Sequence, residues 1–235
     1  MICIPRIREK IRGQVRPNYH NKVNFGLLTT MLNLCGLRRW YPNLTLAIVL
    51  FLLLPFGPAV PAGWADERLY ALNLYAGWMT SNHWDDFFHN ADDLKFKDSY
   101  LIGVTLSRRI GRYQDKASFE IEGQIVKHFN FQTHWELNAL VAARWEKFWW
   151  DDVLDTSVAF GLGPSFATDE PEIESERDGN TSRFLIYWML ELAIGLPDYP
   201  RVALITRIHH RSDAFGLISN GGGSNAFAFG LKWRF

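Results

Sequence analysis

The stretch HWELNALVAARW, residues 134–145, alternates apolar and polar side chains along its length. One face collects Trp135, Leu137, Ala139, Val141, Ala143 and Trp145, and the other collects His134, Glu136, Asn138 and Arg144. Because successive side chains of a strand point to opposite faces, this period of two indicates a strand with one apolar face. The run also reaches the ~9–11 residues that a tilted strand needs to cross a bilayer, whereas ordinary strands average ~5–6 residues.

Seven further segments show the same alternation. With the first one, the expected strands cover residues 68–79, 98–110, 116–130, 133–147, 152–167, 182–196, 201–213 and 225–235. Three connections are short, GRYQD (111–115), EKFWWDD (146–152) and LPDYPR (196–201), and three of those between them are long, 80–97, 168–181 and 213–224. A soluble sandwich would alternate too, but strands of this length joined by alternating short turns and long loops are typical of outer-membrane barrels.

Aromatic residues gather where the expected strands end. They are Trp145, Phe148, Trp149 and Trp150 beside one turn, and Trp78, Trp84, Phe87 and Phe88 beside the first long loop. Such clusters are typical of the two interfacial girdles of a membrane barrel. The chain ends in FAFGLKWRF (227–235), and a final strand closing on an aromatic residue resembles the signal that the barrel-assembly machinery recognises. We therefore predict an all-β fold, an eight-stranded antiparallel transmembrane barrel of the Gram-negative outer membrane.

The first 65 residues differ from the rest. A basic segment precedes the apolar run LTLAIVLFLLLPFG (44–57), and PAVPAGWADE (58–67) follows it, a pattern typical of a cleaved signal peptide. We expect cleavage after Ala65, with Ala62 as the alternative, and Met31 as an alternative start that would give an ordinary basic region. The run is short for a membrane helix, which needs about 20 residues, and an N-terminal anchor is the competing interpretation.

Residues 66–235 then form the barrel. Residues 1–65 hold eight of the chain's 25 Lys and Arg residues and one of its 25 Asp and Glu residues, which leaves 17 basic and 24 acidic residues, a formal charge of −7. This charge argues against nucleic-acid binding. Both cysteines, Cys3 and Cys35, lie in the part expected to be removed. Disulfides, thiol catalysis and cysteine–zinc sites are therefore excluded from the barrel.

An eight-stranded barrel has an interior that side chains fill. The alternation places the following charged residues inside, where opposite charges can pair and no channel remains: Glu120, Glu122, Glu136, Arg144, Glu191, Arg207, His209, Arg211 and Arg234. The acidic stretch DEPEIESERDG (169–179) is expected to be a solvated outer loop, with divalent-cation bridging to lipopolysaccharide phosphates as its functional alternative.

The stretch RIHHRSDAFG (207–216) divides between the two faces of its strand. Arg207, His209 and Arg211 point inward, whereas His210 and Ser212 follow the apolar face that meets lipid. Polar groups facing lipid are costly, and a serine beside a histidine base has a chemical use, because the base activates the hydroxyl. No metal or other cofactor is expected. His209 and His210 point to opposite faces, and His128 with His134 makes too unspecific a pair.

The barrel together with His210-Arg211-Ser212 resembles the lipid A 3-O-deacylase (PagL-like) family of Gram-negative outer membranes, whose eight-stranded barrels carry a His-x-Ser-Asn motif on strand 7. The resemblance covers the barrel in architecture, and its motif covers a few residues near the C-terminus. It implies a carboxylic ester hydrolase in which Ser212 is the nucleophile and His210 the general base. The implied partner is lipid A of lipopolysaccharide in the outer leaflet, from which the ester-linked acyl chain at position 3 is removed.

The chain departs from the family pattern at three places. Asp213 stands where an Asn follows the serine, Gly216 comes one residue later than the family's oxyanion-hole glycine, and the family's Glu about twelve residues after the serine is missing. Asn225 as a hydrogen-bond acceptor, or Asp213 after a bulge, are the candidates to orient His210. Two alternatives stay open, a non-catalytic structural or adhesive barrel and another lipid A-modifying barrel such as an oxidase or palmitoyltransferase. Whether the barrel forms a homodimer is also open.

Overall fold

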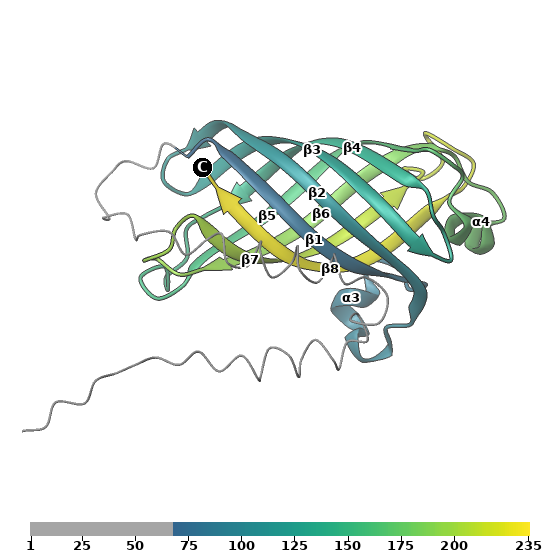
Figure 1. The fold of residues 1–235 in the computed structure, drawn as a ribbon, viewed down its shortest axis with the longest axis horizontal. Helices are drawn as coiled ribbons and strands as arrows, with labels where there is room; N and C mark the ends of the chain where they lie inside the picture. The colour runs from purple at the N-terminus through teal and green to yellow at the C-terminus, as the bar shows by residue number, and fades with distance from the viewer. Residues whose placement is uncertain (1–67) are drawn as a thin grey trace, which may run out of the picture. The chain divides into compact units, whose positions relative to one another are not determined.

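The computed structural model describes residues 68–235, which form one closed antiparallel barrel (Figure 1). Its strands are β1 (Tyr70–Thr80), β2 (Phe96–Tyr113), β3 (Ala117–Asn130), β4 (Trp135–Trp145), β5 (Asp155–Ala167), β6 (Phe184–Gly195), β7 (Val202–Ser212) and β8 (Gly223–Arg234). Short helices lie in two of the connections: α3 (Asp86–His89) with η2 (Ala91–Asp93), and α4 (Glu172–Asp178). No helix in residues 68–235 is long and apolar enough to cross a membrane.

Each strand pairs with its neighbour in the chain, and β8 pairs with β1 to close the sheet. The predicted eight-stranded antiparallel barrel is therefore confirmed. Closure gives every strand two hydrogen-bonded neighbours, so no edge is left unpaired, which is the condition for a sheet in lipid. We call the end with the connections 114–116, 146–154 and 196–201 the turn end, and the opposite end the loop end.

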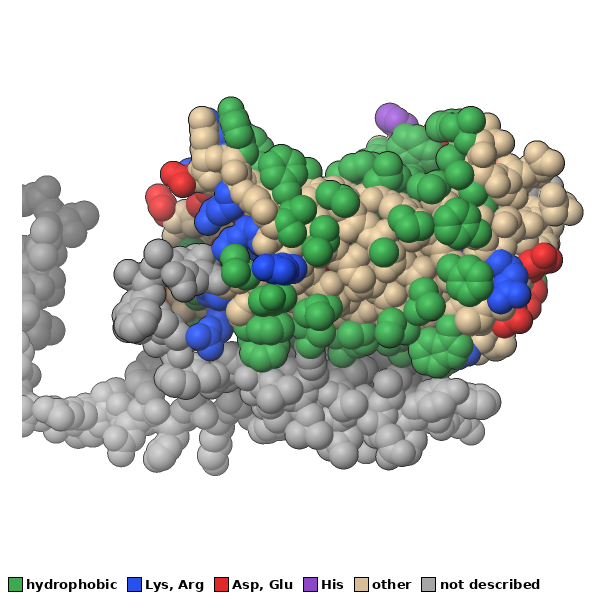
Figure 2. All heavy atoms as spheres, turned by 90° about the horizontal axis from the view of Figure 1, so that it is seen from above, with side chains coloured by type: hydrophobic (Ala, Val, Ile, Leu, Met, Phe, Trp, Pro, Cys, Tyr) green, Lys and Arg blue, Asp and Glu red, His purple; other side chains and the backbone are tan. Residues whose placement is uncertain are grey.

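The alternation seen in the sequence gives the barrel its two faces. In β4 every second residue is exposed and the residues between are buried, in the register predicted from residues 134–145. The outer face carries exposed large apolar side chains on every strand, such as Val104, Ile125, Val141, Phe160 and Leu204. Figure 2 shows hydrophobic side chains over the middle of one face, with Lys, Arg, Asp and Glu gathered toward its ends. An apolar band between charged rims matches a surface solvated by lipid tails.

The interior is filled by a charged network. Arg207 donates to Glu122 at 2.8 Å and to Glu191 at 2.5 Å, and Arg144 donates to Glu120 and Glu191, each at 2.8 Å. Lys232 also donates to Glu191, at 2.6 Å. Three cations thus face three carboxylates, which lets buried charges compensate each other. The predicted inward placement is confirmed, except that Arg234 lies at the turn-end rim, where it bonds Asp155 at 2.6 Å.

The stretch 169–179 differs from the solvated outer loop that the sequence predicted. It contains helix α4, at the loop end in Figure 1, and its Ile173 and Glu174 are buried rather than solvated. Arg211 from inside the barrel donates to Glu174 at 2.9 Å, and Ser224 and Thr181 donate to the same carboxylate. The sequence suggested a solvated loop because it holds six acidic residues, but one of them, Glu174, pairs with the buried Arg211. The signal peptide, the cleavage sites and the alternative start lie outside the described residues.

Candidate active site on the outer wall

His210 and Ser212 lie near the loop end of β7 and follow the outer face of the sheet. Arg211 between them is buried inside with its guanidinium on Glu174, so the strand alternates as predicted. In the ladder, His210 stands opposite Trp188 of β6 and Asn225 of β8. Residues opposite each other on neighbouring strands share a face, so these three side chains form one outward row.

Asn225 is bonded to His210. The distance from His210 Nδ1 to Asn225 Oδ1 is 2.5 Å, and Asn225 Nδ2 donates to the backbone carbonyl of Asn82 at 2.8 Å. A carbonyl oxygen only accepts, so the second bond orients the amide with Oδ1 toward the imidazole. Nδ1 must then carry the proton, and the lone pair is on Nε2. This is the tautomer that a general base needs.

Aromatic side chains cover the imidazole. The Trp188 ring lies 4.6 Å from that of His210, and Trp84 from the first long loop packs edge-on against Trp188 at 5.7 Å. Phe87 of α3 stacks on Phe227 of β8, with the ring centroids 5.9 Å apart. His210 is left only 7% exposed. The segment 81–93 therefore forms one wall of the site, and Figure 1 shows α3 against the outside of the barrel.

The backbone turns sharply after Ser212. Ala214, Phe215 and Gly216 have φ of +54°, +60° and +80°, a left-handed run that is costly for the two residues with side chains. The Ala214 N–H donates to Ser212 Oγ at 3.1 Å. The Phe215 N–H donates to Asp213 Oδ1 at 3.1 Å, so this carboxylate closes its own turn and does not orient His210. Of the two candidates for that role, the structure brings Asn225 to the imidazole.

A pocket of about 540 Å³ opens beside this turn. Its wall includes Asp213, Gly216, the glycines of 221–222 and the exposed Arg177 of α4. Within residues 68–235 the Gly216 N–H has no hydrogen-bond acceptor, and strained turns of this kind present such amides to anions. Arg177 is the one cation of α4, but the sequence could not single it out, because only the fold brings it beside Gly216 and the glycines of 221–222.

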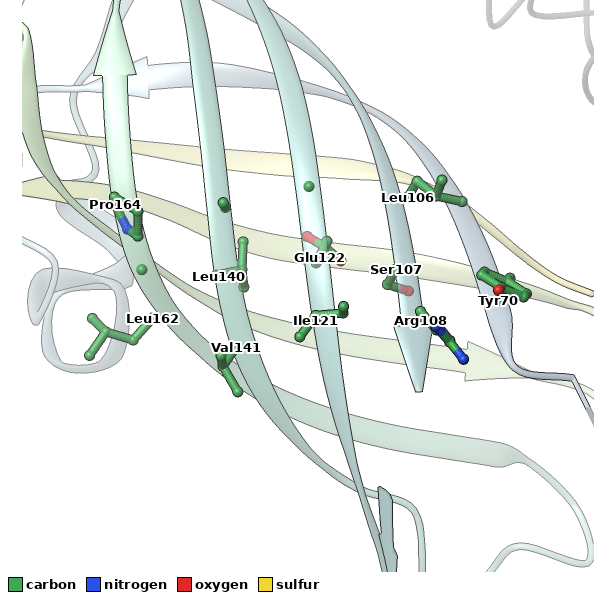
Figure 3. A pocket seen from close by; sticks show the side chains of 13 residues that line it. Tyr70, Leu106, Ser107, Arg108, Ile121, Glu122, Leu140, Val141, Leu162 and Pro164 are labelled. Carbon is green, nitrogen blue, oxygen red and sulfur yellow. The ribbon is translucent and has the colours of Figure 1, made fainter. Parts of the chain in front are cut away.

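A second hollow, of about 520 Å³, lies over β1 to β5 (Figure 3). Leu106, Ile121, Val141 and Leu162 border it, and Gly123 and Ala139 leave its floor without large side chains. Its lining residues come from strands other than β7 and β8, so it is separate from the His210 row. As part of the apolar outer face, it fits lipid tails rather than a catalytic site.

Comparisons with known proteins leave the family unassigned. No known family profile and no curated protein matches the chain. Among solved structures, the outer membrane enzyme PagL is similar at a TM-score of 0.49 and 11% identity, over 70% of this chain and 99% of PagL. Neisserial surface protein A is similar at a TM-score of 0.45 and 11% identity, over 72% of this chain and 98% of its own. LpxR from Salmonella typhimurium is similar at 0.35 and 11%, over 73% and 69%. We draw no conclusion about activity from similarities at this level, and the barrel rests on its own strand pairing.

Proposed function

We propose that the chain is an outer-membrane esterase that removes an ester-linked acyl chain from lipid A. The observation that carries the proposal is the Asn82–Asn225–His210 chain of hydrogen bonds, which holds the base tautomer of an imidazole on the outer wall two residues from Ser212. Residues two apart on a strand share a face, so the base and the hydroxyl both lie toward the lipid. An ester at the depth of the outer leaflet is a substrate that reaches this position.

The proposed reaction has two steps. Ser212 Oγ attacks the acyl carbonyl while His210 Nε2 takes its proton, and the tetrahedral intermediate collapses as Nε2 returns that proton to the sugar oxygen that leaves. Water, deprotonated by the same nitrogen, then hydrolyses the acyl-serine and releases the fatty acid. The open N–H of Gly216 is the candidate donor to the oxyanion. Asn225 replaces the missing acid as the group that orients the base.

The pocket beside the turn supplies a place for the headgroup. Lipid A carries phosphates on its sugars, and the pocket is lined by Arg177 and by the glycine-rich segment 220–222. Guanidinium groups bind phosphate through two parallel hydrogen bonds. A phosphate in this pocket would hold the sugar next to Ser212, and the acyl chains would lie along the apolar outer wall.

The test is the mass spectrum of lipid A from Gram-negative cells that express the chain. Wild type should remove one hydroxyacyl chain, whereas Ser212→Ala and His210→Ala should leave lipid A as in cells with empty vector. Ser118→Ala is the matched control, because Ser118 bonds Glu146 at the turn end, and it should behave as wild type. Unchanged lipid A with all proteins, each shown to be folded, would contradict the proposal and favour a non-catalytic barrel.

A further inference from the structure

Three metal-binding side chains meet inside the barrel near the loop end. They are His128 on β3, His134 in the connection 131–134 and Glu136 on β4, and their donor atoms all lie within 4.8 Å of one another. Each side chain is at most 3% exposed. The hairpin explains the meeting, since the His128 N–H donates to the His134 carbonyl, which places the two residues opposite each other on the inner face.

His134 has no structural explanation for its burial. Within residues 68–235, neither its Nδ1 nor its Nε2 has a hydrogen-bond partner, and its ring stacks on that of His128 at 4.2 Å. A buried polar group without a partner loses its hydration and gains nothing in return. A charged network alone would therefore not retain a histidine here. A ligand that accepts a nitrogen lone pair would account for it.

Glu136 is held as a metal-binding carboxylate is held. One oxygen, Oε2, lies 3.0 Å from His128 Nε2. The other, Oε1, accepts from Asn138 at 2.7 Å and lies 3.0 Å from His209 Nε2, which is farther from Oε2, at 3.3 Å. Hydrogen bonds to the far oxygen orient a carboxylate and leave the near oxygen for an ion, as the outer partners of metal ligands do.

We propose that His128, His134 and Glu136 bind a zinc ion inside the barrel. Two imidazoles and one carboxylate, with water in the fourth position, are a ligand set that zinc takes, whereas calcium and magnesium require oxygen ligands. Zinc–ligand bonds near 2.1 Å place tetrahedral ligands about 3.4 Å apart. The His128–Glu136 pair is already near this spacing, and His134 lies in a connection rather than in a strand, so it is the residue that adjusts.

The sequence prediction of no metal site considered His128 and His134 without the carboxylate. Glu136 was correctly expected inside, but the alternation by itself does not show that it shares a level of the barrel with both histidines. The zinc proposal is independent of the esterase, because these residues lie on the inner face and Ser212 follows the outer one. The zinc proposal can fail without affecting the esterase proposal, and the esterase proposal can fail without affecting the zinc proposal.

The experiment uses the folded barrel in detergent micelles, first stripped with a chelator. One equivalent of Co²⁺ should give the visible absorption of a tetrahedral site, Zn²⁺ should displace it, and Zn²⁺ should raise the unfolding temperature. His134→Ala and His134→Gln should each weaken Zn²⁺ affinity by about 100-fold or more. His89→Ala, at an exposed histidine of α3, is the matched control and should bind as wild type.

The His134 variants remove no hydrogen bond, so they should fold, which heat-modifiable electrophoretic mobility checks. X-ray absorption of the wild-type zinc complex should show two imidazole ligands and one carboxylate, and this readout needs no variant. The proposal is overturned if the wild type shows no saturable binding of Zn²⁺, if His134→Gln binds as tightly as wild type, or if the absorption spectrum gives another ligand set.

Discussion

At the scale of single residues, two adjacent histidines have opposite surroundings. His209 is inside the barrel, with Nε2 3.0 Å from Glu136 and its ring against Tyr187, whereas His210 lies on the outer face, bonded to Asn225. A shift of one residue along the strand therefore separates His209, a member of the interior network, from His210, the candidate base. The same spacing rules out a shared ion for the pair, because their imidazoles lie on opposite sides of the sheet.

We predict that Asn225 acts by positioning. Asn225→Ala should lower kcat for ester hydrolysis by about 100-fold with KM little changed, because the imidazole loses its orientation while the substrate pocket stays. Asn225→Asp keeps an acceptor for Nδ1–H and should retain more activity than Asn225→Leu. Steady-state kinetics on purified lipid A in micelles would measure this. Equal activity of the Asp and Leu variants would contradict an orienting role.

At the scale of elements, the closing seam between β1 and β8 depends on a glycine. Gly230 stands opposite Tyr75, and a Cβ at this position would lie 2.1 Å from the Leu74 carbonyl oxygen and 2.6 Å from Tyr75 Cα. These are backbone atoms and have no rotamer by which to move away. A side chain here would push the two strands apart at the pair that closes the barrel.

Gly230→Ala should therefore destabilise the folded barrel by roughly 1–3 kcal/mol or more, the usual cost of overpacking. Urea unfolding in micelles, followed by tryptophan fluorescence, would measure the change. Gly123→Ala is the matched control, since a Cβ on Gly123 meets nothing within 4 Å. A stability of Gly230→Ala equal to that of the control would show that the seam can relax around the added carbon.

We predict that the docking of helix α4 onto the barrel depends on pH. Burial raises the pKa of the Glu174 carboxyl above its ordinary 4.5, although Arg211, Thr181 and Ser224 all donate to it. Because the docked carboxyl binds its proton more tightly than the free one, docking of α4 weakens as pH rises from 4.5 through the raised pKa. Hydrogen exchange of residues 169–181, corrected for intrinsic rates, should show greater protection at low pH. Glu174→Gln should remove this pH-dependent part, and Glu172→Gln, at an exposed residue of the same helix, should keep it.

The elements also show what the sequence could and could not predict. Alternation gave all eight strands, their faces and the outward placement of His210 and Ser212, because each depends only on neighbours along one strand. Contacts between distant segments were not accessible. The Asn225 amide is oriented by Asn82, 143 residues away, and Glu174 is recruited from an acidic loop by Arg211. The local composition of that loop predicted that it would be solvated. The buried cation that pairs with Glu174 is Arg211 of β7, and its position inside the barrel is known only once the sheet has closed.

At the scale of the whole molecule, the interior charges close the lumen. Arg207 lies between Glu122 and Glu191 and is fully buried, as are both carboxylates to within a few per cent. Each charge is compensated by a partner on another strand, so the network ties together β3, β4, β6, β7 and β8 across the barrel. This cross-linking is the reason we expect a rigid wall behind the outer site rather than a pore.

The network makes the barrel sensitive to the loss of one member. Arg207→Met removes a cation and leaves Glu122 and part of Glu191 buried without it, which should destabilise the fold by about 3–5 kcal/mol. The urea midpoint in micelles measures this, with Arg183→Met as the matched control, since Arg183 is an exposed loop-end residue over the Phe166 ring. A double variant, Arg207→Met with Glu122→Gln, should recover part of the loss, because it removes an unpaired charge. An equal urea midpoint for Arg207→Met and Arg183→Met would mean that water enters the lumen and solvates the carboxylates. The inference that the interior charges close the lumen would then be wrong.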